Sequence, residues 1–303
     1  MVPEFQRFAD EFETTKETVL SVSDFLKCVS TKWNEWKEKV SWYPQETLPW
    51  FRGVGEESYK LVPSIYRGKG VIGWGYNANQ AVDMQAEFAR RAKPFITRNI
   101  PYGAGEYLHL MQHYRFPTRL LDWTEGALIA LYFAIRIQIS GRKKTPCVWM
   151  LNPSWLNYRN DKTIRNEATG ENKSLVLYTD RDSLENERFP QDRVIRDYYL
   201  DEHNLGELPV AVFPPLIDPR IVAQKSVFTI HGHCKDGFDL LLRQYPAEAQ
   251  ICKLRISPEM ATIESMTKEL SMMGMTETTI YPDLEGLSRE IQAEYEMPLK
   301  RID

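Results

Sequence analysis

The chain has 303 residues, of which 43% are hydrophobic and 12% aromatic, so it can bury a substantial core and most of it is expected to be ordered. A formal net charge of −4 gives no general electrostatic reason to bind nucleic acid or an anionic membrane, although local basic groups could still bind an anion. The four cysteines form no Cys-x-x-Cys pair, the first residues lack a signal-peptide pattern, and the longest apolar run is about half the roughly 20 residues of a membrane span. We therefore expect a soluble cytoplasmic protein.

The first half of the chain shows mainly helical periodicity. Apolar residues recur at helical spacing over about 24–39 and 80–96, and a third helix is expected over 105–114. Residues 48–55 read as a short strand or loop. The unbroken apolar run 127–135 predicts a buried helix, and we expect Thr124 to cap it.

After residue 144 the pattern changes to short stretches rich in β-branched and aromatic residues. Such stretches predict strands, and they occur at 147–151, 174–178, 208–215, 226–232 and 250–256. Two further helices are expected near the end of the chain, over 258–274 and 283–295.

This order of elements favours an α+β fold, in which N-terminal helices are followed by a short-stranded mixed or antiparallel sheet. No linker divides the chain, so residues 1–303 are interpreted as one domain. Within it we expect an N-terminal helical segment over about 1–45 and a polar loop insertion over about 158–187.

Polar and ionisable side chains crowd the approach to the predicted buried helix. These are His113, Tyr114, Arg115, Arg119, Asp122 and Thr124. Burying such groups without partners costs about 1–3 kcal/mol each, and more for charges. Either these side chains satisfy one another or they hold a ligand.

Three separated stretches resemble the landmarks of the FRG domain family, which is named for its Phe-Arg-Gly motif. They are "WFRG" at 50–53, "QHYRFPTRLLDWTEGALIALYFA" at 112–134 and "TTIYPDLEGL" at 278–287. The stretch around "AQKSVFT" also resembles the family's AQ-x-G-x-F-T strand, with Ser226 in place of glycine. The resemblance covers roughly residues 22–287 and implies a fold more than a chemistry.

A second resemblance is to NAD-dependent ADP-ribosyltransferases, which place an arginine on an early strand and a Ser/Thr-bearing strand before an A-x-x-F-A helix. It implies an ADP-ribosyltransferase-like sheet in which Arg52 holds the cofactor NAD. Thr124, with Asp122 and Trp123 beside it, would support the nicotinamide ribose, and Gln224 would orient the reacting hydroxyl. No Glu-x-Glu or Gln-x-Glu pair occurs at that last position, which favours NAD binding or NAD cleavage over transfer.

The chemistry of NAD agrees with these residue types. A site needs a phosphate anchor, an aromatic wall and an acceptor near the ribose hydroxyls. Arginine binds phosphate in a bidentate manner, and a helix N-terminus favours anions. We assign the catalytic roles to Arg52, Thr124 and Gln224, with Glu285 as a second candidate for holding a hydroxyl. The expected cofactor-binding residues are Arg52, His113, Tyr114, Arg119, Asp122 and Trp123.

Each of these residues also has a structural interpretation. Arg52 and Asp122 could form an interior ion pair, His113 a satisfied core histidine, and Arg119 local bonds. Asp283 and Glu285 could cap the last helix and face solvent. A metal site is not expected, because His231, His233 and Cys234 lack a matching set of further ligands.

Three functions remain open. The first is an NAD-using ADP-ribosyltransferase-like or NAD-cleaving enzyme of an intracellular toxin or phage-defence type, acting in bacteria. The second is a non-catalytic module that binds a nucleotide or another ligand. The third, nucleic-acid binding, is disfavoured by the acidic balance of the chain. The enzyme hypothesis requires Arg52, Asp122, Thr124 and Gln224 to converge on a pocket that solvent can reach.

Overall fold

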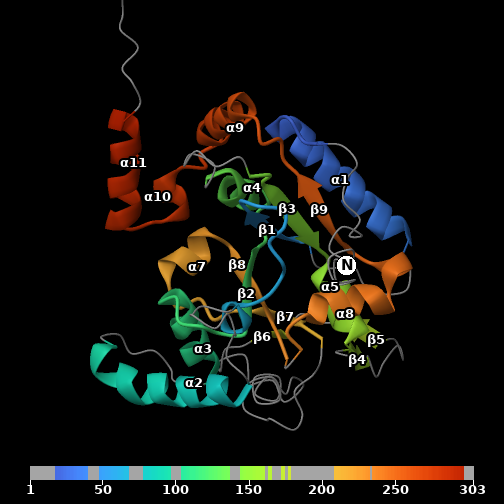
Figure 1. The fold of residues 1–303 in the computed structure, drawn as a ribbon, viewed down its shortest axis with the longest axis vertical. Coiled ribbons are helices and arrows are strands. Elements are labelled where there is room, and N and C mark those ends of the chain that lie inside the picture. The colour runs from blue at the N-terminus through green and yellow to red at the C-terminus, as the bar shows by residue number, and fades with distance from the viewer. Residues whose placement is uncertain are drawn as a thin grey trace, which may run out of the picture.

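The computed structural model describes residues 18–39, 48–67, 78–96, 104–136, 144–160, 163–165, 172–174, 177–178, 208–232 and 234–296. In this part of the chain a central sheet is covered by helices (Figure 1). None of the described helices is both long enough and apolar enough to cross a membrane.

The secondary structure alternates between helices and strands along the chain. The helices are α1 (Val22–Lys39), α2 (Ala78–Ala92), α3 (Ala104–His113), α4 (Ala127–Ile135), α5 (Pro153–Arg159), α7 (Pro219–Ala223), α8 (Gly237–Gln244), α9 (Met260–Met272), α10 (Glu277–Ile280) and α11 (Leu284–Glu296). The strands are β1 (Trp50–Val54), β2 (Leu120–Thr124), β3 (Cys147–Leu151), β4 (Thr163–Arg165), β5 (Asn172–Ser174), β6 (Leu177–Tyr178), β7 (Val210–Phe213), β8 (Ser226–Ile230) and β9 (Ile251–Arg255).

The main sheet has seven strands in the order β6-β7-β8-β2-β1-β3-β9. The six strands from β7 to β9 are antiparallel to their neighbours, and β6 is parallel to β7. The predicted α+β class with a mixed, mainly antiparallel sheet is confirmed. The predicted order is wrong, because β1 and β2 come from the first half of the chain and lie at the centre of the sheet.

Helices cover both faces of the sheet. On one face, α1, α4 and α9 pack over β1, β3 and β9, and α3 contributes Leu108 to an apolar cluster with β2, β7 and β8. On the other face, α5 and α8 pack over a second core that includes Trp50, Trp123 and Trp149. Successive strand residues point to opposite faces, so the six strands from β7 to β9 in the sheet order supply side chains to the cores on both faces.

Gly53 allows α4 to lie directly against β1. A Cβ atom at this position would be 1.8 Å from the carbonyl oxygen of Ala130 and 2.7 Å from the amide nitrogen of Ala134. Both are backbone atoms, so a side chain could fit only if the helix moved. The glycine of the Phe-Arg-Gly sequence thus sets the spacing between this strand and this helix.

Two local predictions need correction. The N-cap of α4 is Gly126, two residues after Thr124, whose hydroxyl instead accepts a hydrogen bond from the Gly126 amide at 2.9 Å. The stretch 158–187 is not a simple loop, since its described parts include the β4–β5 hairpin and β6. The remainder of that stretch, and most of 1–45 apart from α1, lie outside the described residues.

Candidate functional site

A pocket of about 500 Å³ lies beside the central strands, where residues of α3, α4 and α7 meet β1, β2 and β8. Its polar and charged lining residues are Arg52, Ser64, His109, Gln112, His113, Arg115, Asp122, Thr124, Arg220, Gln224 and Ser226, and its aromatic ones are Phe51, Phe116, Trp123, Phe133, Phe228 and Tyr281. Pockets of this size are typical of small-molecule sites.

Arg52 projects from β1 toward β2. These two strands share a single residue pair, Phe51 with Thr124, whereas β1 and β3 share five. The Arg52 guanidinium donates a 2.5 Å hydrogen bond to the main-chain carbonyl of Asp122 and lies 3.7 Å from its carboxylate. Its side chain is 17% exposed. It is therefore anchored on the neighbouring strand and still borders the pocket.

Burial lowers the pKa of the Arg52 guanidinium, while the nearby Asp122 carboxylate opposes this change and Arg67 adds to it. A guanidinium starts from so high a pKa that it stays charged in proteins. The pocket therefore has a fixed positive charge beside its central strand.

Asp122 is the one acid among the described residues that line the pocket. Its side chain is 56% exposed, and its carboxylate accepts a 2.8 Å hydrogen bond from the Gln112 amide. Three arginines, Arg52, Arg115 and Arg220, line the same pocket. The ionisable lining is therefore positive on balance, which favours an anionic ligand.

Thr124 and Gln224 both line the pocket, and their polar groups bind the main chain. The Thr124 hydroxyl donates to the Gln224 carbonyl at 2.7 Å, which uses its only proton. The Gln224 side-chain amide donates to the Ile280 carbonyl at 3.1 Å. These bonds connect β2 to the end of α7, and α7 to α10.

The aromatic residues predicted beside the cofactor lie in different places. The Trp123 indole is 3% exposed, donates a 3.1 Å hydrogen bond to Thr229 and packs near Phe238 in the opposite core. Tyr114 is 68% exposed and lies outside the pocket lining, with its ring 4.9 Å from that of His113. Trp123 therefore borders the pocket while its indole packs in the opposite core, and the other aromatic lining residues supply the aromatic wall.

His113 lines the pocket, with its Nδ1 atom 3.6 Å from an Asp218 carboxylate oxygen. Arg119 does not reach the pocket. Its side chain is buried, and its charge opposes the burial-driven rise in the pKa of Tyr66. Of the predicted residues, the structure thus brings to one pocket Arg52, His113, Asp122, Trp123, Thr124 and Gln224, and it places Arg119 and Tyr114 elsewhere.

Several lining residues were not predicted from the sequence as part of the site. His109 is one, on the buried side of α3, where burial lowers its pKa to about 3 and keeps its ring neutral. Arg220 and the aromatic residues Phe133 and Tyr281 are others. The helical spacing of His109, Gln112 and His113 could have grouped part of this set, and Phe133 and Tyr281 lie in stretches that resemble family landmarks.

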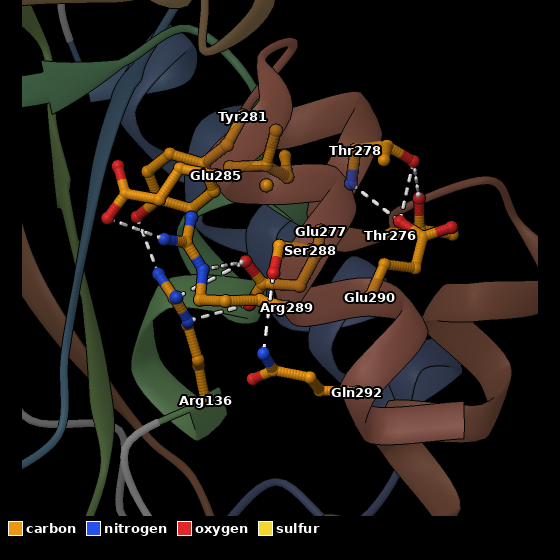
Figure 2. Close-up of polar contacts among 12 residues, drawn as sticks. Arg136, Thr276, Glu277, Thr278, Tyr281, Glu285, Ser288, Arg289, Glu290 and Gln292 are labelled. Carbon is orange, nitrogen blue, oxygen red and sulfur yellow. Dashed lines mark hydrogen bonds and ion pairs between the residues drawn. The ribbon is translucent and has the colours of Figure 1, made fainter. Parts of the chain in front are cut away.

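Residues 277–296, comprising α10, the turn at Tyr281 and α11, form what we call the C-terminal corner. Figure 2 shows the Tyr281 ring beside Arg136 and Arg289. The guanidinium carbons of Arg136, Arg289 and Arg220 lie 4.8, 4.7 and 5.5 Å from its centroid. Cations are attracted to the face of an aromatic ring, so Tyr281 holds this charged cluster together.

Carboxylates of the corner pair with the same arginines. Glu277 binds Arg136 at 2.9 Å and Arg289 at 3.0 Å (Figure 2), and it also accepts a hydrogen bond from the Tyr132 hydroxyl. Asp283 and Glu285 bind Arg220 at 2.5 and 2.9 Å.

Asp283 and Glu285 each have a second contact. Asp283 also caps α11 through the Gly286 amide, and the hydrogen bond from Arg220 lowers the pKa of Asp283 to about 2. Glu285 pairs with Arg289 as well, and its side chain is 61% exposed. Arg220 therefore lines the pocket while its guanidinium is paired with the Asp283 and Glu285 carboxylates.

No group of three or more potential metal-binding side chains occurs among the described residues. Of the sequence cluster considered above, His231 is buried, Cys234 is in no disulfide among the described residues, and His233 lies outside the described residues. Burial, together with the charges of Arg52 and Arg67, lowers the pKa of His231 to about 3.

Comparison with known proteins adds one relationship. Residues 48–143 match the family model described as the FRG domain. Searches of curated proteins and of solved structures returned no match. The matched segment includes β1, α3, β2 and α4, which carry Arg52, His113, Asp122 and Thr124, whereas α7, β8 and the C-terminal corner lie beyond it. Residues 48–143 of this chain are therefore similar to the FRG domain.

Proposed function

We propose that the pocket binds a phosphate-bearing nucleotide, and that NAD is the ligand to test first. The observation that carries this proposal is the placement of Arg52, Arg115 and Arg220 around one pocket whose described lining includes a single acid. Arginine is suited to phosphate because its planar guanidinium forms two parallel charged hydrogen bonds with it.

The rest of the lining supports a nucleotide over a simple anion. Tyr281 and Phe133 offer ring surfaces on one side, with their centroids 6.3 Å apart at 87°. Asp122 is half-exposed, so its carboxylate is free to accept hydrogen bonds from ribose hydroxyls. A phosphate grip, an apolar wall and a hydroxyl acceptor together match the parts of a nucleotide.

Binding is tested by calorimetric titration with NAD, ADP-ribose and nicotinamide. We expect NAD and ADP-ribose to bind and nicotinamide alone to give no detectable heat, because the arginines hold the phosphates. Arg52→Lys keeps the charge and loses the bidentate geometry, so it should weaken NAD binding by roughly tenfold. Arg90→Lys, on the exposed side of α2, is the matched control and should change nothing. Wild-type protein that fails to bind NAD at millimolar concentration overturns the proposal.

NAD cleavage is the second candidate function, and the position of Asp122 favours it. A carboxylate beside a ribose can stabilise the positive charge that develops as the glycosidic bond breaks. Thr124 and Gln224, whose polar groups brace the backbone, would then position the strand rather than touch the reacting atoms. An intracellular toxin or defence role would follow from such an activity.

Release of nicotinamide separates the two functions. Incubation with NAD followed by chromatography should show free nicotinamide if the protein is an enzyme, and Asp122→Asn should abolish that release while NAD still binds. Binding without release identifies a nucleotide-binding module. The nucleic-acid alternative predicts oligonucleotide affinity that falls steeply with salt.

A further inference from the structure

Arg115 has a backbone conformation that arginine rarely adopts. Its φ angle is 58°, in the left-handed region. It follows the end of α3, where the Phe116 amide bonds to the Met111 carbonyl at 2.9 Å and the Arg115 amide to the Gln112 carbonyl at 3.0 Å. This pair of bonds is the usual helix ending in which glycine occupies the left-handed position. An L-residue with a side chain is strained there, and glycine is not.

The Arg115 side chain faces the pocket and is exposed to solvent. Within the part of the chain that the structure describes, its guanidinium forms no hydrogen bond or ion pair, whereas Arg52 is bound to Asp122 and Arg220 to Asp283 and Glu285. Phe116, the next residue, packs its ring 5.2 Å from that of Phe88 and so fixes the segment beside α2. Arg115 is thus held at the pocket with its charge available.

Backbone strain tends to persist where a side chain is needed for function. We propose that Arg115 is a specificity-determining residue that binds a phosphate group of the ligand. This inference rests on the proposed nucleotide binding and singles out, among the three arginines of the pocket, the one whose guanidinium has no partner in the described chain. The protein retains a strained backbone here because glycine would relieve the strain and remove the phosphate contact.

Lys225 provides a matched control for the strain. It has a φ angle of 44° just after α7, and its side chain is exposed and does not line the pocket. Its main chain is also fixed, because its amide bonds to the Val222 carbonyl and its carbonyl accepts from the Glu125 amide. Glycine at this position should relieve similar strain without touching the ligand.

The experiment measures the melting temperature and the dissociation constants for NAD and inorganic pyrophosphate in wild-type protein, Arg115→Gly, Arg115→Lys and Lys225→Gly. Arg115→Gly should raise the melting temperature by about 2 °C and weaken NAD binding roughly tenfold. Arg115→Lys should keep the wild-type melting temperature and lose less affinity. Lys225→Gly should show a similar rise in melting temperature and keep the wild-type affinity for NAD.

The outcomes separate this inference from the proposed function. NAD binding that is equal in wild-type protein and Arg115→Gly overturns the role of Arg115 and leaves nucleotide binding intact. Pyrophosphate binding that needs Arg115, without any NAD binding, supports the role of Arg115 and overturns the nucleotide proposal. Wild-type protein that binds neither probe overturns both.

Discussion

The central strands of the pocket and the C-terminal corner are held by different kinds of contact. At the strands, the side chains of Arg52 and Thr124 bond to main-chain carbonyls. At the corner, side chains bond to side chains, as Glu277 does with Arg136 and Arg289 (Figure 2). The strands are also largely buried, while the corner faces solvent on its outer side.

This difference separates a fixed part of the site from an adjustable one. A main-chain acceptor moves only if its strand moves, so the geometry around Arg52 is set by the sheet. A partly exposed ion pair contributes little and is screened by salt, so its partners can exchange. We therefore expect the strands to dominate stability and the corner to adapt to the ligand.

The largest expected effect is at Gly53. Gly53→Ala forces a Cβ atom onto the backbone of α4 and should lower the free energy of unfolding by about 3 kcal/mol or more. Gly274→Ala is the control, because Gly274 has a φ angle of 80° but no atom within 4 Å of an added Cβ, so strain alone should cost about 1 kcal/mol. Urea denaturation of both variants measures the difference. Equal losses would show that contact with α4 is unimportant.

As the pH falls, the protein should lose the stability that depends on two buried histidines before it loses the stability that depends on Asp283 of the corner. The folded pKa values of His109 and His231 are about 3, below the ordinary value of 6.5, so the stability that depends on their neutral state is complete above pH 6.5 and is lost as the pH falls. At pH 5 each of these two histidines should lower the free energy of unfolding by about 2 kcal/mol relative to pH 7.5. The Asp283 contribution is lost only lower, between about pH 4 and pH 2, because its folded pKa is about 2.

Unfolding measured between pH 7.5 and pH 5 tests this order. His109→Gln and His231→Gln should each remove about half of the loss, and Asp283→Asn should leave this interval unchanged. A pH dependence that survives both histidine substitutions would contradict the assignment.

The smallest effects are expected within the corner itself. Glu277→Gln should destabilise the protein by about 1–2 kcal/mol, because its carboxylate serves two arginines and the Tyr132 hydroxyl and is only 18% exposed. Glu285→Gln, at 61% exposure, should have a smaller effect that disappears at high salt. Thermal unfolding at low and high salt compares the two. A larger loss for Glu285→Gln would reverse the roles assigned to these carboxylates.

The sequence predicted many of the individual helices and strands. The buried run of α4 and the strands β3, β7, β8 and β9 follow from apolar patterning, and the corner helix α11 follows from its cap at Asp283. The sheet order was beyond such patterns, because pairing of β2 with β8 depends on contacts between residues far apart in the chain.

For the candidate site, too, the sequence pattern was informative about side chains on a single strand and uninformative about residues brought together by packing. Alternation along β2 already implies that Asp122 and Trp123 cannot point to the same face, so the indole wall could have been excluded. Arg220 and Tyr281 gave no comparable signal, since they reach the pocket only through the packing of α7 and the corner. The positive φ angle of Arg115 likewise depends on how α3 ends.

The hydrogen bonds from Thr124 to Gln224 and from Gln224 to Ile280 have a practical consequence for dissecting the protein. They attach the C-terminal corner, which contributes Tyr281 to the pocket, to the strands of segment 48–143 that line the same pocket. A fragment cut at residue 143 would lack β3 as a neighbour for β1 and β8 as a neighbour for β2, and would also lose Arg220 and Tyr281. The smallest piece that contains the whole pocket lining is therefore larger than the segment 48–143 that matches the family model.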